Sequence, residues 1–446
     1  MNSRCRLPEH ATDDTPTTCS VRHTRAVNIV LIATIVTVLL GILFDFTNGF
    51  HDAANATSTV IATKSLRPRQ AVLLSAVFNF IPAFVVGTAV ANTIAKTVNL
   101  DDLPAVAEGA VPYGVRVTLA ALIGAIFWNY ATWFLGLPSS SSHALIGGLI
   151  GAGISAAGLA AVNWDSVWKT VVAIFASPAV AISIAFIAMS VIRMIQRRWK
   201  VNEDSEFFRW AQVGSSAWVS WGHGTNDAQK TMGVIAATLY SAGYLNATSS
   251  SALEPPTWVV FAAHLAIAAG TLWGGWKIIE TMGLKITRIT RASGFAANLG
   301  AISAIDGASH LGIPISTTQA VSASIVGSGV GARRRVNWRV MRDMVIAWFV
   351  TMPAAAAVGF VIFKLTVLPG GLAIVATVAA IAVLLVWAGR LMLHAEKASD
   401  VEAKLPSDEE LRNPSYGFQV AQVESSDADV RVNLRDEFKI HPDDQV

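Results

Sequence analysis

The chain is dominated by long apolar stretches that contain no Asp, Glu, Lys or Arg. A helix needs about 20 residues to cross the hydrocarbon core of a bilayer, and most of these stretches reach that length. They lie at 26–44, 70–95, 117–164, 170–192, 231–253, 255–276, 307–332, 344–363 and 365–389. Because the longer stretches can hold more than one helix, the pattern predicts an all-α polytopic membrane protein with about 10–12 membrane segments.

The composition excludes a soluble enzyme. Of the 446 residues, 53% are hydrophobic and only 14% are charged, whereas soluble domains carry about 25% charged residues. The 33 glycines permit close approach of helices, and the 14 tryptophans suit the interfaces of a membrane. Because the first apolar run is long enough to span, we expect a retained helix and not a cleaved signal peptide.

Charge predicts the orientation of the segments. Basic residues gather in connecting segments at 64–69, 193–209, 277–291 and 333–342. The positive-inside rule places these segments in the cytoplasm, and the acidic stretch at Asp101 and Asp102 suits the outer side. The first segments of the two halves of the chain are then expected to cross the membrane in opposite directions.

Two polar motifs occur once in each half of the chain. Residues 48–55 align with 223–230 at an offset of 175, which places Asp52 on Asp227. Residues 136–143 align with 312–319 at an offset of 176, which places Pro138 on Pro314. A duplicated motif with opposite orientation is typical of inverted-repeat transporters, whose binding site lies between the repeats near the membrane midplane.

The repeat defines the domain organisation that we expect. Its parts are a polar N-terminal tail (1–25), a first repeat (26–192), a basic cytoplasmic loop (193–209), a second, inverted repeat (210–393) and an acidic, disordered C-terminal tail (394–446).

The two aligned aspartates are functional candidates because a carboxylate inside a membrane is costly and needs a partner. Gly49 and Gly224 are expected to unwind the helices beside them and to expose carbonyl oxygens that suit a cation. We assign four residues to a coupling ion, either a proton or sodium: Asn48, Asp52, Asp227 and Gln319. No catalytic residue, bound cofactor or resident metal is expected.

The second motif has the opposite chemistry. Pro138 and Pro314 each precede a run of hydroxyl residues, so each should end one helix and let another begin at Ser140 or Ser316. A helix N-terminus with free amides and several hydroxyl donors attracts an anion. Donors for an anion together with carboxylates for a cation are what symport requires.

At this point the chain resembles the PiT inorganic phosphate transporters. The resemblance covers roughly 26–390 and rests on Asn48-Gly49-x-x-Asp52-x-x-Asn55, His223-Gly224-x-Asn226-Asp227-Ala228-Gln229-Lys230 and the segment from Pro138 to His143. It implies two re-entrant helical hairpins and a homodimer. It also implies a phosphate and coupling-ion site made of Asp52, Asn55, Ser140, Ser141, Ser142, Asn226, Asp227, Thr317 and Thr318.

Several residues have two interpretations. Lys230 either neutralises Asp227 or contacts the anion directly, and we include it among the substrate-binding candidates. His143 is either a structural donor to a nearby carbonyl or part of a proton path. The glycines at 147, 151 and 153 are expected to serve close helix packing.

The functional hypothesis is uptake of inorganic phosphate, free or as a metal complex, across the plasma membrane, with lipid as the surroundings and no nucleic acid partner. A sulfate or other oxyanion permease of the same fold is a close alternative. An intramembrane serine hydrolase using a Ser near His143 with Asp52 is a further alternative, and a passive channel is another. No Gly-x-x-x-x-Gly-Lys-Ser/Thr loop is present, which disfavours direct coupling to ATP.

Overall fold

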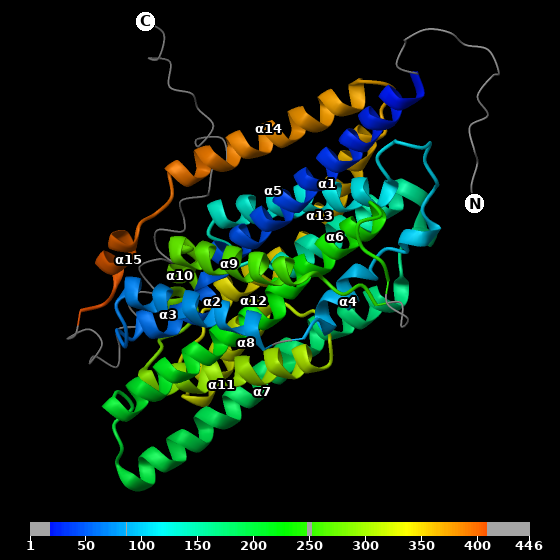
Figure 1. The fold of residues 1–446 in the computed structure, drawn as a ribbon. Coiled ribbons are helices and arrows are strands. Elements are labelled where there is room, and N and C mark those ends of the chain that lie inside the picture. The colour runs from blue at the N-terminus through cyan, green and yellow to red at the C-terminus, as the bar shows by residue number, and fades with distance from the viewer. Residues whose placement is uncertain (1–17, 86, 248–251, 408–446) are drawn as a thin grey trace, which may run out of the picture.

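The computed structural model describes residues 18–85, 87–247 and 252–407, and every regular element in these ranges is a helix (Figure 1). The α-helices are α1 (Thr18–His51), α2 (Ala53–Ala62), α3 (Pro68–Phe80), α4 (Ala89–Ala95), α5 (Tyr113–Phe134), α6 (Ser141–Ala157), α7 (Trp164–Trp199), α8 (Glu206–Ser241), α9 (Thr257–Trp273), α10 (Trp276–Glu280), α11 (Arg291–His310), α12 (Thr317–Gly331), α13 (Trp338–Thr366), α14 (Leu372–Leu393) and α15 (Ala398–Lys404). Short 3-10 turns lie at Ile81–Phe84, Leu100–Asp102 and Leu159–Ala161, and a π-helical turn at Thr281–Lys285 follows α10.

The expected tails lie largely outside the described residues. Of the N-terminal tail, residues 1–17 are not described, and α1 begins at Thr18. Of the acidic tail, residues 408–446 are not described. Within its described part, the short helix α15 replaces the disorder that we expected from 394 onward, and its Val401 side chain is buried.

Membrane-spanning helices confirm the all-α polytopic class. Within the described residues, five helical segments are long and apolar enough to cross a bilayer, and the number rises to seven if each of two bent helix pairs is counted as one span. The five are Ile29–Ala62, Tyr113–Phe134, Trp164–Trp199, Trp338–Thr366 and Leu372–Leu393. The total of about 10–12 segments stays a prediction, because helices such as α6 are apolar but shorter than a span.

The two halves of the chain exchange their packing partners. Helix α6 of the first half packs against α13 of the second, and α12 of the second half packs against α7 of the first. Glycines make both contacts possible, as predicted: a Cβ atom at Gly151 would collide with the carbonyl oxygen of Ala356, and one at Gly327 with that of Ile182. Helix α6 and helix α12 are therefore each held in place by the other half.

The first motif breaks its helix and the second does not. Helix α1 ends at His51 and α2 begins at Ala53, so a one-residue turn at Asp52 interrupts the helical segment Ile29–Ala62. Helix α8 runs without interruption through Gly224, and the unwinding that we expected there is wrong. The physical reason is packing, because a Cβ at Gly224 would collide with the Asn79 carbonyl. Gly49 likewise lies against the carbonyl of Ile267.

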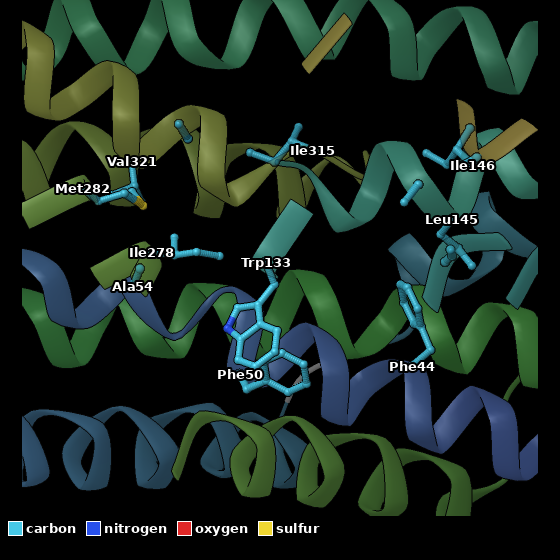
Figure 2. Close-up of a cluster of buried hydrophobic side chains, with 14 of the residues drawn as sticks. Phe44, Phe50, Ala54, Trp133, Leu145, Ile146, Ile278, Met282, Ile315 and Val321 are labelled. Atoms are coloured by element: carbon cyan, nitrogen blue, oxygen red, sulfur yellow. The ribbon is translucent and has the colours of Figure 1, made fainter. Parts of the chain in front are cut away.

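Buried aromatic and aliphatic side chains surround the point where the chain turns (Figure 2). Phe50 packs edge-to-face against Trp133, with 5.0 Å between ring centroids, and also contacts Tyr130. At the periphery, α14 buries only Leu384 and Ala388, and it lies along one edge of the molecule in Figure 1. The apolar side chains therefore form a buried core around the motifs and an outer face suited to lipid.

Candidate functional site

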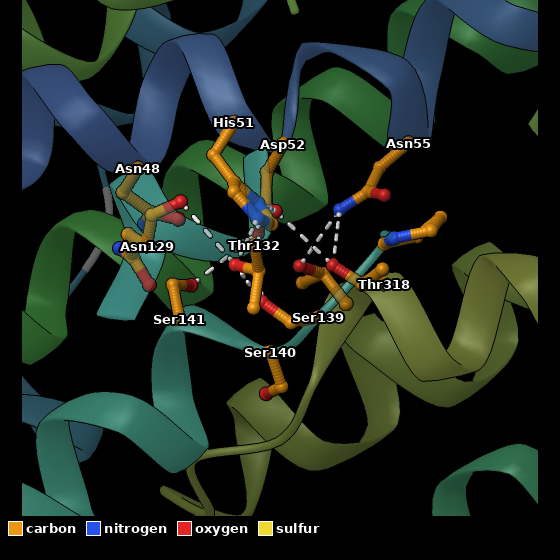
Figure 3. A network of polar contacts seen from close by, with 12 residues as sticks. Asn48, His51, Asp52, Asn55, Asn129, Thr132, Ser139, Ser140, Ser141 and Thr318 are labelled. Carbon is orange, nitrogen blue, oxygen red and sulfur yellow. Dashed lines mark hydrogen bonds and ion pairs between the residues drawn. The ribbon is translucent and has the colours of Figure 1, made fainter. Parts of the chain in front are cut away.

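The Asp52 carboxylate lies where α1, α6 and α12 converge, and it is buried (Figure 3). Its Oδ1 lies 2.7 Å from Nδ1 of His51 and accepts a hydrogen bond of 3.1 Å from the Thr318 hydroxyl. Its Oδ2 accepts a hydrogen bond of 3.3 Å from the Ser141 hydroxyl. The turn after α1 thus brings the first carboxylate against the N-termini of both hydroxyl-rich helices.

The Asp227 carboxylate occupies the corresponding place on α8 and is also buried. It accepts hydrogen bonds from Nζ of Lys230 at 2.5 Å, from the Asn48 amide at 3.2 Å and from the Thr317 hydroxyl at 3.3 Å. The Nε2 atom of His223 lies 3.3 Å from it. Partners from both halves of the chain therefore satisfy this charge, which reduces the cost of burying it.

Positions that the sequence repeat aligns make matching contacts. Ser141 donates to Asp52, and its aligned residue Thr317 donates to Asp227, both at 3.3 Å. Asn48 reaches across to the aspartate of the other half, and its aligned residue His223 lies 3.8 Å from Asp52. One ligand atom each from Asp52, His223 and Asp227 lies within 4.8 Å of the others, so the two motifs build a single site.

The two proline breaks produce the helix starts that the sequence predicts. Helix α6 begins at Ser141 and α12 begins at Thr317. The hydroxyl of Ser140 accepts from the amide of His143, and that of Ser316 accepts from the amide of Gln319, each at 3.2 Å. The neighbouring hydroxyls donate to Asp52, Asp227 and the Ile315 carbonyl, and the remaining first-turn amides of a helix start suit an oxyanion.

Lys230 connects the two hydroxyl-rich helices. Its side chain is fully buried, and besides Asp227 its ammonium donates to the Ser142 hydroxyl at 2.5 Å and to the Ile315 carbonyl at 2.9 Å. Asn55, which the repeat aligns with Lys230, donates to the hydroxyls of Thr317 and Thr318 at 3.1 and 3.2 Å. Lys230 thus holds α6 near the carboxylates, and Asn55 holds α12 there.

In the described part of the chain, no hydrogen bond to either carboxylate is found for five of the predicted residues: Asn55, Ser140, Ser142, Asn226 and Gln319. Asn226 donates to the Ser309 hydroxyl at 3.0 Å and accepts from the amide of Ile315, so it fixes the segment ahead of α12. Ser140 acts as a helix cap. The Gln319 side-chain oxygen is buried without a hydrogen-bond partner among the described residues, and its role in ion coupling stays a prediction.

Two histidines at the site were not among the predicted binding residues. His51 bridges Asp52 and the second motif, because its Nε2 lies 3.3 Å from both the Thr132 and the Ser139 hydroxyls. His223 lies between the two aspartates. The available signal was spacing, since His223 lies four residues, about one helical turn, before Asp227 and so shares its face. His143, by contrast, contacts the Trp348 carbonyl at 3.3 Å, which is a structural position.

The site combines two kinds of chemistry within a small buried volume. Carboxylates and an imidazole can hold a cation or a proton, and the Asp52, His223 and Asp227 cluster also has ligand types that suit a metal ion. The hydroxyls and free amides of α6 and α12 can hold an oxyanion. The expected absence of a resident metal stays a prediction.

Comparison with known proteins gives a consistent result. A model of the phosphate transporter family matches residues 48–359. A probable low-affinity inorganic phosphate transporter of Bacillus subtilis (strain 168) is 43% identical over 337 residues, covering 75% of this chain and 98% of that protein. One of the same description from Rhizobium meliloti (strain 1021) is 42% identical, covering 72% and 92%.

A solved structure is similar as well. The structure described as the sodium-dependent phosphate transporter superposes with a TM-score of 0.66 at 25% sequence identity, covering 76% of this chain and all of that one. The matched family region contains both aspartate motifs and both hydroxyl-rich helix starts. This chain, a polytopic membrane protein, therefore belongs to the phosphate transporter family.

Proposed function

We propose that this protein is a secondary active transporter that takes up inorganic phosphate across the plasma membrane, coupled to a proton or sodium gradient. The observation that carries the proposal is the meeting of two buried carboxylates with two hydroxyl-rich helix N-termini at one site. Relatives named as probable low-affinity inorganic phosphate transporters support the choice of substrate.

Electrostatics explains why an anion and a cation would travel together. Two unit charges about 4 Å apart interact by about 4 kcal/mol at an effective dielectric constant of about 20. A phosphate dianion beside Asp52 would meet about twice that repulsion unless cationic charge lies between them, whereas Asp227 is already paired with the Lys230 ammonium. Binding of the anion therefore depends on binding of the cation, which is the thermodynamic basis of coupling.

Phosphate fits the site better than sulfate because of hydrogen-bond chemistry. The carboxylates of Asp52 and Asp227 are acceptors, and HPO4²⁻ or H2PO4⁻ carries a hydroxyl that can donate to them. Sulfate has no such donor. We expect unlabelled phosphate to compete strongly with radiolabelled phosphate for uptake into proteoliposomes, and sulfate to compete weakly. Equal competition by sulfate would favour a general oxyanion permease, and dependence of uptake on Mg²⁺ would favour a metal complex as the substrate.

The serine hydrolase alternative can be tested at a single contact between a serine, a histidine and an aspartate. A Ser–His–Asp contact exists at Ser139, His51 and Asp52, and not at His143 as the sequence suggested. The Ser139 side chain is fully buried, and its hydroxyl also shares a hydrogen bond of 2.7 Å with the Thr132 hydroxyl, so it belongs to a packed hydrogen-bond network. We expect no covalent labelling by a fluorophosphonate probe, and labelling at Ser139 would require the hydrolase hypothesis to be taken up again.

A further inference from the structure

The repeat aligns Lys230 with a neutral residue. At the offset of 175 its counterpart is Asn55, and at the offset of 176 its hydroxyl partner Ser142 corresponds to Thr318. The contacts agree with this alignment, because Lys230 donates to Ser142 and Asn55 donates to Thr318. The two halves thus build equivalent positions, one with an ammonium group and the other with an amide.

The surroundings of the Lys230 ammonium are those of a cation site. Its three partners are a carboxylate oxygen of Asp227 at 2.5 Å, the Ser142 hydroxyl at 2.5 Å and the Ile315 carbonyl at 2.9 Å. Carboxylate, hydroxyl and carbonyl oxygens form the ligand set that hard cations use in proteins. The side chain has no exposed surface, so its charge cannot be screened by water.

The equivalent position beside Asp52 has no tethered cation. Thr318 donates to Asp52 there, and the Asn55 amide donates to Thr317 and Thr318. The side-chain oxygen of Asn55 is buried and has no hydrogen-bond partner in the described part of the chain. A carboxylate with a neutral neighbour and an unpartnered oxygen nearby leaves this position able to accept a cation from solution.

We infer that Lys230 is a built-in cation that permanently fills one of two equivalent cation positions, and that a single exchangeable cation binds at the other, beside Asp52. The tethered ammonium neutralises Asp227, and the exchangeable cation neutralises Asp52. The other titratable groups near the two carboxylates are His51, His223 and the buried Asp45, which accepts a hydrogen bond from Thr231 and lies within electrostatic range of Asp227. A chain with asparagine at 230 would need two exchangeable cations for the same charge balance.

This inference concerns the coupling part of the proposed function, and a binding measurement tests it without transport. The thermal stability of the detergent-purified protein is measured in sodium chloride and in choline chloride of equal ionic strength, without phosphate. We expect Lys230→Asn to show a larger sodium-specific rise in Tm than the wild type, because a ligand that binds only the folded state stabilises it. The matched variant Lys230→Met lacks the amide oxygen and should show no such gain. An equal sodium response in the wild type and both variants would overturn the inference.

The reciprocal variant provides a second, independent test that does not require Lys230→Asn to fold. Asn55→Lys would place a tethered ammonium beside Asp52 and fill the remaining position. We expect the cation dependence of radiolabelled phosphate binding to fall at least tenfold in this variant. Unchanged cation dependence in Asn55→Lys would contradict the inference. Failure of the wild type to bind phosphate would instead count against the proposed function, while the sodium effect on Tm would still decide the role of Lys230.

Discussion

At the scale of single residues, Asp52 and Asp227 are the acceptors around which the candidate site is built. Each carboxylate is buried. Asp52 accepts a hydrogen bond from Ser141 of α6, and Asp227 accepts one from Thr317 of α12, so each donor comes from the same half as its aspartate. Each also contacts a residue from the other half, since Thr318 donates to Asp52 and Asn48 donates to Asp227. Both halves of the chain therefore contribute donors to each carboxylate.

Replacing either carboxylate by an amide should remove coupling without unfolding the protein. Asp52→Asn and Asp227→Asn keep the size of the side chain but remove the charge that attracts the cation. We expect concentrative phosphate uptake in proteoliposomes to fall by at least a hundredfold in each variant, with an unchanged gel-filtration profile. The control is Asp102→Asn in an exposed turn, which should transport normally. Normal uptake by Asp52→Asn or Asp227→Asn would exclude that carboxylate from the mechanism.

Removing a hydroxyl from the first turn of α6 or α12 should weaken phosphate binding. A hydrogen bond to a charged group contributes about 1.5–3 kcal/mol, which corresponds to a tenfold or greater change in affinity. We therefore expect Ser141→Ala or Thr317→Val to raise the phosphate concentration needed for half-maximal uptake by about tenfold. The dependence of uptake on the coupling ion should change less. The double variant gives the clearest result, and unchanged transport by it would contradict an anion site at these helix starts.

At the scale of the elements, the close packing of α6 and α12 depends on glycine. A Cβ at Gly151 of α6 would collide with the Ala356 carbonyl of α13, and one at Gly147 with the Met352 carbonyl. On the other side of the site, Gly327 of α12 has the same relation to Ile182 of α7. Because the starts of α6 and α12 carry the hydroxyls, an error in this packing would displace the proposed anion site.

Adding volume at one of these glycines should therefore impair both stability and transport. Forcing extra methyl groups into a packed interior costs about 1–3 kcal/mol, and a collision with backbone costs more. We expect Gly151→Val to lower the Tm of the purified protein by several degrees. Gly389→Val on α14 is the matched control, because a Cβ there meets no atom within 4 Å. Similar Tm values for the two variants would show that the α6–α13 contact is less close than described.

The sequence predicted those features that depend on local chemistry. The two helix starts followed from proline, which cannot continue a helix, and from hydroxyl residues that cap one. The position of His223 between both aspartates could not be predicted, because it depends on how α8 lies against the turn at Asp52. The uninterrupted course of α8 through Gly224 was also missed, since a glycine that permits close packing and one that permits unwinding look alike in sequence.

At the scale of the whole molecule, the basic segments that predict topology also make ion pairs. Arg334 pairs with Glu203 at 2.7 Å and so joins the basic loop to the segment ahead of α13. Lys404 of α15 pairs with Glu280 of α10, also at 2.7 Å. Glu203, Glu280 and Arg334 belong to segments that we expect on the cytoplasmic side. The first pair would join the loop between the repeats to the second repeat there, and the other pair joins α15 to the second repeat.

Labelling from one side of the membrane tests this orientation. With Cys5 and Cys19 replaced by serine, Lys200→Cys and Asp102→Cys each place one exposed thiol in a connecting segment. We expect a membrane-impermeant maleimide added to intact cells to label position 102 and to label position 200 only after permeabilisation. Labelling of position 200 in intact cells would be incompatible with the inverted orientation of the two halves.

The most direct test of the account is the steady-state accumulation of phosphate in proteoliposomes that contain only this protein. A sodium gradient and a pH gradient are imposed separately, and each is then collapsed with an ionophore. A coupled transporter predicts that one of the gradients drives internal phosphate above the external concentration, and that the excess disappears when the gradient is collapsed. Phosphate that only equilibrates under both gradients would identify a passive pathway and contradict coupling through the paired carboxylates.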